Sequence, residues 1–67
     1  MFPNLEAEQA RLYHTNTDVA NLLDISRNAY EQKKKTGNFR FVEIKKLLQI
    51  YECEFSYLFS EKIKQAI

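Results

Sequence analysis

Residues 16–35, with the sequence NTDVANLLDISRNAYEQKKK, predict two short helices joined by a tight turn. Asp24 stands where the chain reverses, and aspartate tolerates the left-handed backbone conformation better than most residues with a side chain. Ser26 follows as the expected N-cap of the second helix, because its hydroxyl can accept a hydrogen bond from an unpaired amide. Ala20 is small enough to let the two helices cross closely, and Tyr30 is expected to pack back onto the first helix.

The second helix of this pair carries polar side chains between its expected buried positions. These are Arg27, Asn28, Glu31, Gln32 and Lys35. Its outer face therefore consists almost wholly of hydrogen-bonding groups. Such a face suits the major groove of DNA, where each base pair presents a distinct set of donors and acceptors. The arrangement is typical of a helix-turn-helix.

The residues before and after this pair of helices occur at the positions expected for one family of proteins. The matching positions are Asn4, Leu5, Ala20, Ile25, Ser26, Arg27, Tyr30, Phe41, Ile44, Leu47, Leu48, Tyr51, Cys53, Phe55, Tyr57, Leu58 and Phe59. Through them nearly the whole chain resembles the Cro and lambda-type repressor family, also called XRE-type, in its phage and prophage form. The resemblance implies one lambda-repressor-like domain over residues 1–67 that binds a double-stranded DNA operator. It also implies a transcriptional regulator, in particular a repressor in a phage or prophage switch.

The expected DNA contacts divide into those that read bases and those that hold phosphates. Arg27 can pair with guanine, and Glu31 can accept a hydrogen bond from cytosine. Asn28 or Gln32 can bridge adenine, whereas Lys35 is expected to contribute to binding on all duplexes. Hydroxyl, amide and guanidinium groups donate to phosphate oxygens. The residues expected to hold phosphates are Asn16, Thr17, Ser26 and Arg40.

The charges are distributed unevenly, although the net charge of the chain is only +1. Residues 1–26 carry four carboxylates against one arginine, a net charge of −3. Residues 27–46 carry seven cations against two carboxylates, a net charge of +5, and residues 47–67 have a net charge of −1. A run of like charges often only solvates a surface. Here the basic block coincides with the proposed reading helix, which favours a phosphate-binding surface.

Helical periodicity predicts an all-α domain of five helices, near residues 4–13, 16–23, 26–35, 41–51 and 55–65. Asn4 is the expected N-cap of the first helix, and Gly37 suits a left-handed end of the third. Phe39 is expected to fold back onto the core. The fourth helix is expected to bury Phe41, Ile44, Leu47, Leu48 and Tyr51.

Two positions depart together from the family pattern. Family members often have arginine at the position of Gln9 and glutamate at that of Lys34, and the two form an ion pair between the first and third helices. The Gln9 carbonyl can still accept one hydrogen bond from Lys34. The expected fold is unchanged, because replacing both members of a pair is often tolerated.

Several classes of protein are not expected. Cys53 cannot form an internal disulfide, and its apolar neighbours predict a buried, inert thiol in a reducing, cytoplasmic setting. His14 has neither a second His nor a neighbouring Cys, which disfavours a metal site and predicts a half-buried structural role. With no catalytic constellation, we expect no enzyme, cofactor or small-molecule substrate. No apolar run is long enough to span a membrane, and Met1-Phe2-Pro3 is no signal peptide.

The fifth predicted helix continues its apolar stripe towards the end of the sequence. We expect a homodimer on DNA, with two reading helices on half-sites about one helical turn apart. Phe59, Ile63 and Ile67 are the expected apolar contacts of that dimer. An alternative is a helix-turn-helix protein-interaction module, such as an antitoxin or an adaptor, acting through an acidic surface that carries Glu6 and Glu8.

Overall fold

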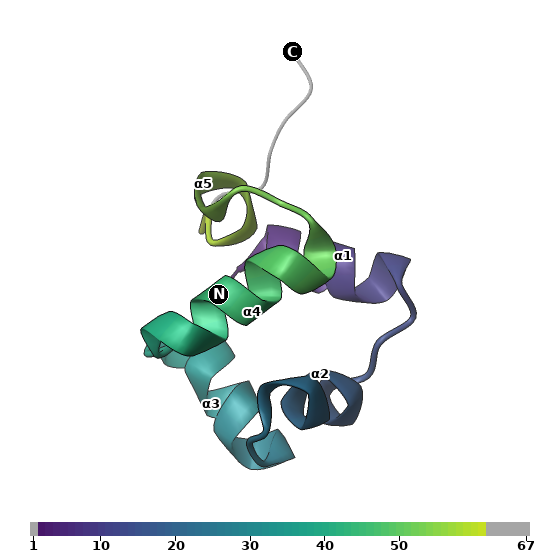
Figure 1. Cartoon of the computed structure of the whole chain (residues 1–67), viewed down its shortest axis with the longest axis vertical. Helices are drawn as coiled ribbons and strands as arrows, with labels where there is room; N and C mark the ends of the chain where they lie inside the picture. Colours follow the sequence, from purple (N-terminus) through teal and green to yellow (C-terminus); the bar gives the residue numbers. More distant parts are fainter. Residues whose placement is uncertain (1, 62–67) are drawn as a thin grey trace.

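The computed structural model describes residues 2–61, which form five helices and no strand (Figure 1). The helices are α1 (Pro3–Arg11), α2 (Asn16–Leu23), α3 (Arg27–Thr36), α4 (Phe41–Tyr51) and α5 (Phe55–Leu58). In Figure 1, α4 crosses the middle of the view, with α1 and α5 on one side and α2 and α3 on the other. The all-α prediction is confirmed over this range.

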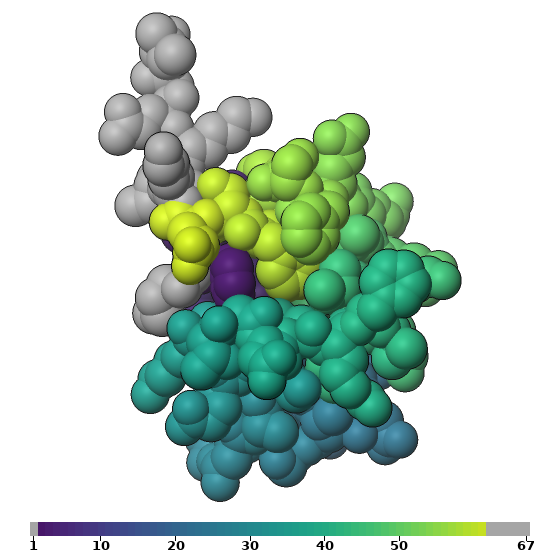
Figure 2. All heavy atoms as spheres, turned by 90° about the vertical axis from the view of Figure 1, so that its left-hand side faces the viewer, coloured from purple at the N-terminus to yellow at the C-terminus, as the bar shows by residue number. Residues whose placement is uncertain are grey.

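The core lies where the helices meet, because each contributes at least one apolar side chain to it. α2 packs against α3, and α5 packs against both α1 and α4. The buried apolar side chains are Phe2, Leu5, Val19, Ala20, Leu23, Tyr30, Leu47, Tyr51 and Leu58. Figure 2 shows the purple N-terminal residues wedged between the teal α3–α4 region and the yellow end of the described chain. Phe39, half-buried, packs on this core as predicted.

Local signals in the sequence set most helix ends. Thr15 caps α2 by accepting from the Asp18 amide at 3.1 Å, while the Asp18 carboxylate accepts from the Thr15 amide at 2.8 Å. Ser26 caps α3, as predicted, by accepting from the Ala29 amide at 3.1 Å. Asp24 (φ 60°) and Gly37 (φ 77°) adopt the left-handed conformation expected of them.

The predicted N-cap of α1 is wrong. α1 begins at Pro3, whose fixed φ and missing amide suit the first helical position, so Phe2 occupies the cap. Asn4 is the second residue of the helix, is buried, and donates its Nδ2 to the Tyr57 carbonyl at 2.9 Å. α1 also ends at Arg11 rather than at residue 13, because Tyr13 has a left-handed backbone (φ 58°).

The expected burial of Phe41 in α4 is also wrong. Phe41 is 73 % exposed and Glu43 only 1 % exposed. Glu43 turns inward because its carboxylate has three donors there: the Arg40 amide at 2.8 Å, the Lys33 ammonium at 3.1 Å and the Arg40 Nε at 3.3 Å. A fully paired carboxylate can be buried, and the phenyl ring of Phe41 is left at the surface.

α5 is shorter than predicted, ending at Leu58 instead of reaching residue 65. Phe59, which the spacing assigned to a dimer contact, packs inside the domain instead. Its ring centroid lies 5.4 Å from that of Phe2 and 5.5 Å from that of Phe39. Ile63 and Ile67, the other two expected contacts, lie outside the described residues.

Two further features bear on what residues 2–61 can do. No helix in this range is both long enough and apolar enough to cross a membrane. Nor does this range contain a group of three or more His, Cys, Asp or Glu side chains placed to hold a metal ion. His14 is half-buried, as predicted, with its Nδ1 3.0 Å from the Tyr51 hydroxyl.

Candidate nucleic-acid interface

α3 presents two different sides, one to the core and one to solvent. Tyr30 is completely buried and Lys34, one turn later, is 7 % exposed. Asn28, Gln32 and Lys35 are exposed, and none of their side chains makes a hydrogen bond to another residue in the range 2–61; only the backbone carbonyl of Gln32 accepts from the Thr36 hydroxyl, at 3.0 Å. The predicted reading side of α3 is therefore open at these three positions.

The connection between α2 and α3 is short and well fixed. The Ile25 amide donates to the Ala20 carbonyl at 3.0 Å, which closes the end of α2 around the left-handed Asp24. Ala20 is 1 % exposed, as its expected role at the crossing requires. α3 is also tied to α1, because the Tyr30 hydroxyl donates to Gln9 Oε1 at 2.8 Å. Burial raises the pKa of Tyr30, so the phenol remains a protonated donor.

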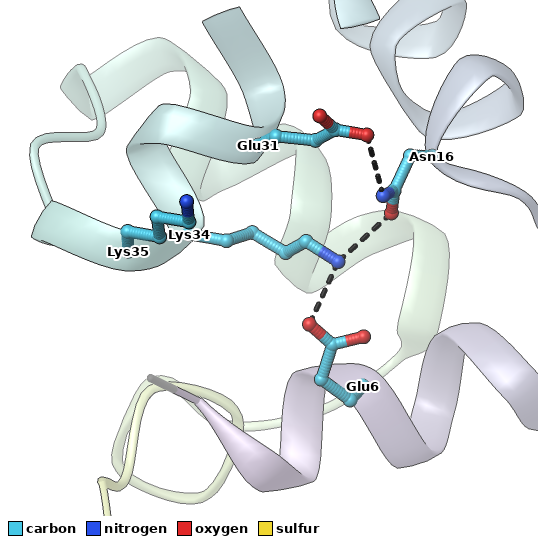
Figure 3. Close-up of a pocket in the computed structure, with 5 residues that line it drawn as sticks. All are labelled: Glu6, Asn16, Glu31, Lys34 and Lys35. Carbon is cyan, nitrogen blue, oxygen red and sulfur yellow. Dashed lines mark hydrogen bonds and ion pairs between the residues drawn. The ribbon is translucent and has the colours of Figure 1, made fainter. Parts of the chain in front are cut away.

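The amide of Asn16 joins the beginning of α2 to α3 and α1 (Figure 3). Its Oδ1 accepts from the Lys34 ammonium at 2.8 Å and from Gln9 Nε2 at 3.0 Å. Its Nδ2 donates to Glu31 Oε2 at 3.1 Å. The reverse orientation would set an NH₂ group against an ammonium and a carbonyl against a carboxylate, so these neighbours decide which way the amide points.

Lys34 is the buried cation of this cluster. Its ammonium lies 2.7 Å from the Glu6 carboxylate, 3.4 Å from Gln9 Oε1 and 4.9 Å from the ring centroid of Tyr30. The predicted hydrogen bond from Lys34 to Gln9 is confirmed. The stronger partner is Glu6, which the sequence reasoning did not connect with Lys34. The spacing contained a signal, because Glu6 and Gln9 stand three residues apart on one side of α1.

Arg27 and Glu31 form an ion pair on the exposed side of α3. Arg27 NH1 lies 3.2 Å from Glu31 Oε2, the same oxygen that accepts from Asn16. The guanidinium side chain is 59 % exposed and the carboxylate side chain 35 % exposed. Three of the predicted DNA contacts are thus brought together, because Asn16 and Arg27 both donate to the Oε2 of Glu31.

The remaining predicted contacts lie around this group. Thr17 is exposed on the first turn of α2. Ser26 is exposed, but its hydroxyl oxygen already serves as the α3 cap. Arg40 belongs to a separate cluster: its side chain is 67 % exposed and its Nε lies 3.3 Å from Glu43.

The Glu43 carboxylate holds the start of α4 to the end of α3. Burial alone would raise the pKa of Glu43, but the Arg40 amide, the Lys33 ammonium and the Arg40 charge outweigh it. The net result is a pKa below the usual value. The ammonium of Lys33 is thus held in an ion pair with Glu43.

The basic block of residues 27–46 offers fewer uncommitted cations than its sequence indicates. Arg27, Lys33, Lys34 and Arg40 are all in ion pairs. Over residues 2–61 no ion pair engages the other three, which are Lys35, Lys45 and Lys46, although Lys45 lies 5.4 Å from the ring centroid of Phe41. A phosphate-binding surface on this block would depend on these three and on exchange of the surface pairs.

Comparisons with known proteins identify no family. No protein-family model matches the sequence, and searches of curated proteins and of solved structures found no match. The resemblance to the Cro and lambda-type repressors therefore remains an interpretation of the residues quoted above.

Proposed function

We propose that the chain binds double-stranded DNA sequence-specifically, with α2 and α3 acting as a helix-turn-helix and α3 lying in the major groove. The main observation that supports this proposal is that α3 has one buried side and one exposed side. Tyr30 and Lys34 anchor the helix inside the domain, while Asn28, Gln32 and Lys35 stand exposed and uncommitted on its outer side. Amides at such positions match the edge of adenine, and a lysine suits a phosphate.

In this proposal the neighbouring side chains position α3 on the duplex. Arg27 pairs with guanine, and Asn16, Thr17, Ser26 and Arg40 contact phosphates. The reading of cytosine by Glu31 is less well supported, since its Oε2 already accepts from Asn16 and from Arg27. A regulator of transcription, in particular a phage or prophage repressor, is the role that the family resemblance supports.

We also propose that the protein binds its operator as a two-fold dimer. A single small module buries only about 600–1,000 Å² of protein surface on DNA, which limits its affinity. Phe59 no longer supports this dimer, because its ring packs against Phe2 and Phe39. Sedimentation of the protein with a palindromic site should give two chains per duplex, and one chain per duplex at saturation would contradict this.

The acidic surface proposed for the alternative, a protein-interaction module, is partly paired within the domain. Glu6 is paired with Lys34, and Glu8 lies 2.8 Å from Arg11 and 3.1 Å from the Tyr57 hydroxyl. The acidic side of α1 is therefore largely neutralised from within. No observation of similar weight favours an antitoxin or an adaptor.

Binding to a random duplex as salt is lowered tests the proposal against this alternative. Fluorescence anisotropy with a labelled random-sequence duplex should show association that weakens steeply with salt, by about 0.9 logarithmic unit per phosphate contact. A variant with Lys35→Gln should bind more weakly with a shallower salt slope, whereas Glu52→Gln, at the far end of α4, should not. If no association appears even at low salt, the interaction-module alternative replaces this proposal.

A further inference from the structure

Glu31 is an acidic residue in the middle of a surface proposed to meet an anion. Its Oε2 lies 3.1 Å from Asn16 Nδ2 and 3.2 Å from Arg27 NH1. It thus occupies one donor on each of two proposed DNA contacts and neutralises the charge of Arg27. Figure 3 shows the carboxylate of Glu31 directed at the amide of Asn16.

The other side of Asn16 keeps this arrangement in place. The Lys34 ammonium donates to Asn16 Oδ1, and the Lys34 side chain is only 9 % exposed and is paired with Glu6. The Asn16 amide therefore cannot turn over without losing a charge-assisted hydrogen bond. Its NH₂ group stays directed towards Glu31, which favours the bond between them in the free protein.

The Arg27 guanidinium is engaged on one side only. Of its nitrogens, NH1 is held by Glu31, while no hydrogen bond to residues 2–61 engages Nε or NH2. The free Nε–NH2 edge can still donate two hydrogen bonds to the O6 and N7 atoms of guanine. A phosphate, by contrast, meets a pair with no net charge, in which the Glu31 carboxylate offsets the attraction of Arg27.

We propose that Glu31 is a specificity determinant, which suppresses sequence-independent binding to duplex DNA while leaving the guanine-reading edge of Arg27 available. This rests on the proposed function. Binding to phosphates is the sequence-independent part of DNA affinity, so a carboxylate beside the phosphate contacts lowers that part selectively. Discrimination between partners often uses such a repulsive element together with attractive ones.

The test compares Glu31→Gln with Glu52→Gln, which removes the same charge from an exposed residue at the C-terminal end of α4. Glutamine keeps the size of the side chain and can still accept from Asn16. On a random duplex, Glu31→Gln should bind about three- to tenfold more tightly than the native protein, with a salt slope steeper by about 0.9. On a site selected from random DNA the gain should be smaller, so the ratio of specific to random affinity falls. Glu52→Gln should change neither affinity.

A second pair of variants tests whether the effect passes through Arg27. In an Arg27→Gln background, Glu31→Gln should tighten random-duplex binding by clearly less than in the native background. If Glu31→Gln behaves like Glu52→Gln, or weakens binding to both duplexes, the proposal about Glu31 is overturned while DNA binding stands. If the native protein and every variant fail to bind any duplex, the proposed function fails and this inference fails with it.

Discussion

The ammonium of Lys34 lies 2.8 Å from the Oδ1 of Asn16, and this bond joins the last turns of α3 to the first residue of α2. Both residues belong to a polar cluster in which Glu6 balances the charge of the lysine. The bond adds a polar contact to the apolar packing of α2 on α3. We therefore expect the buried cation to contribute to how firmly the two helices are held together.

Replacing that cation should lower stability. Lys34→Met keeps most of the aliphatic stem but leaves Asn16 Oδ1 and Glu6 without their charged donor. Because Glu6 is half-exposed and can be solvated, the expected loss is about 1–2 kcal/mol in the free energy of unfolding. Urea denaturation measures it, and the matched control Lys35→Met, on an exposed side of α3, should stay within about 0.5 kcal/mol. Equal midpoints for the two variants would show that the Lys34 cluster does not stabilise the fold.

Glu43 should make a larger contribution to stability, and one that depends on pH. Glu43→Gln leaves the Lys33 ammonium and the Arg40 guanidinium without their buried anion, at an expected cost of about 2–4 kcal/mol at neutral pH. The folded protein holds the pKa of Glu43 below its usual value of 4.5. The stabilisation is therefore complete above pH 4.5 and is lost as the pH falls through the lower, folded-state pKa.

Unfolding curves of the native protein and of Glu43→Gln at several pH values measure this contribution. The stability difference between them should be constant from pH 7 down to about 5 and should shrink at lower pH. The comparison with the variant is needed because hydrogen bonds from Thr15 also lower the pKa of Asp18. Asp18 therefore makes stability depend on pH in both proteins, and its contribution cancels in the difference between them. A difference that does not change with pH would show that the Glu43 pKa is the same in the folded and unfolded chains.

Loss of the α3 cap should cost about 1 kcal/mol. Ser26→Ala removes the oxygen that accepts from the Ala29 amide at 3.1 Å, so one amide at the start of α3 loses its partner. Ser56→Ala, at an exposed position in α5, is the control and should change stability by less than about 0.5 kcal/mol. Thermal or urea unfolding compares the two. Should both serines prove equally dispensable, capping by Ser26 would be energetically unimportant here.

Lys35 should contribute to DNA binding without selecting a sequence. Its ammonium is exposed and is in no ion pair within residues 2–61, so it can meet a phosphate at no cost to the fold. Lys35→Gln is expected to weaken binding to a selected site and to a random duplex by similar factors, and to reduce the salt slope by about 1. Loss confined to the selected site would assign Lys35 to base reading instead.

The helix ends show what the sequence could predict. Ser26, Asp24 and Gly37 act through hydrogen bonds and backbone angles within a few residues, so their local sequence was sufficient. The predicted burial of Phe41 was wrong because hydrophobicity alone favours burying its phenyl ring. Pairing with Lys33 and Arg40 instead buries the carboxylate of Glu43, two residues later. The Arg40 contacts are local to the start of α4, but the pairing with Lys33 depends on how α3 packs beside α4, and neither appears in the apolar periodicity of α4.

The candidate interface likewise has features that the sequence predicted and features that it did not. The exposure of Asn28, Gln32 and Lys35 followed from the helical period once Tyr30 was assigned to the core. The bond of Asn16 to Glu31 did not, because it depends on how closely the start of α2 approaches α3. The Arg27–Glu31 pair is local, four residues apart on α3, but the sequence analysis assigned both side chains to DNA bases instead of to each other. The length of α5 was overestimated because apolar spacing continues beyond Leu58, although the helix does not.

Whether α3 reads DNA bases is decided by selecting a preferred site from random duplex DNA and then measuring how Asn28→Ala binds to it. The selection should yield a defined sequence, and Asn28→Ala should bind it about 1–3 kcal/mol more weakly, with discrimination lost at one A·T base pair. Gln49→Ala, which removes an exposed amide from α4, serves as the control and should bind like the native protein. A selection that returns no preferred sequence, or an Asn28→Ala variant that binds the site as tightly and as selectively as the native protein, would contradict the assignment of α3 as the reading helix.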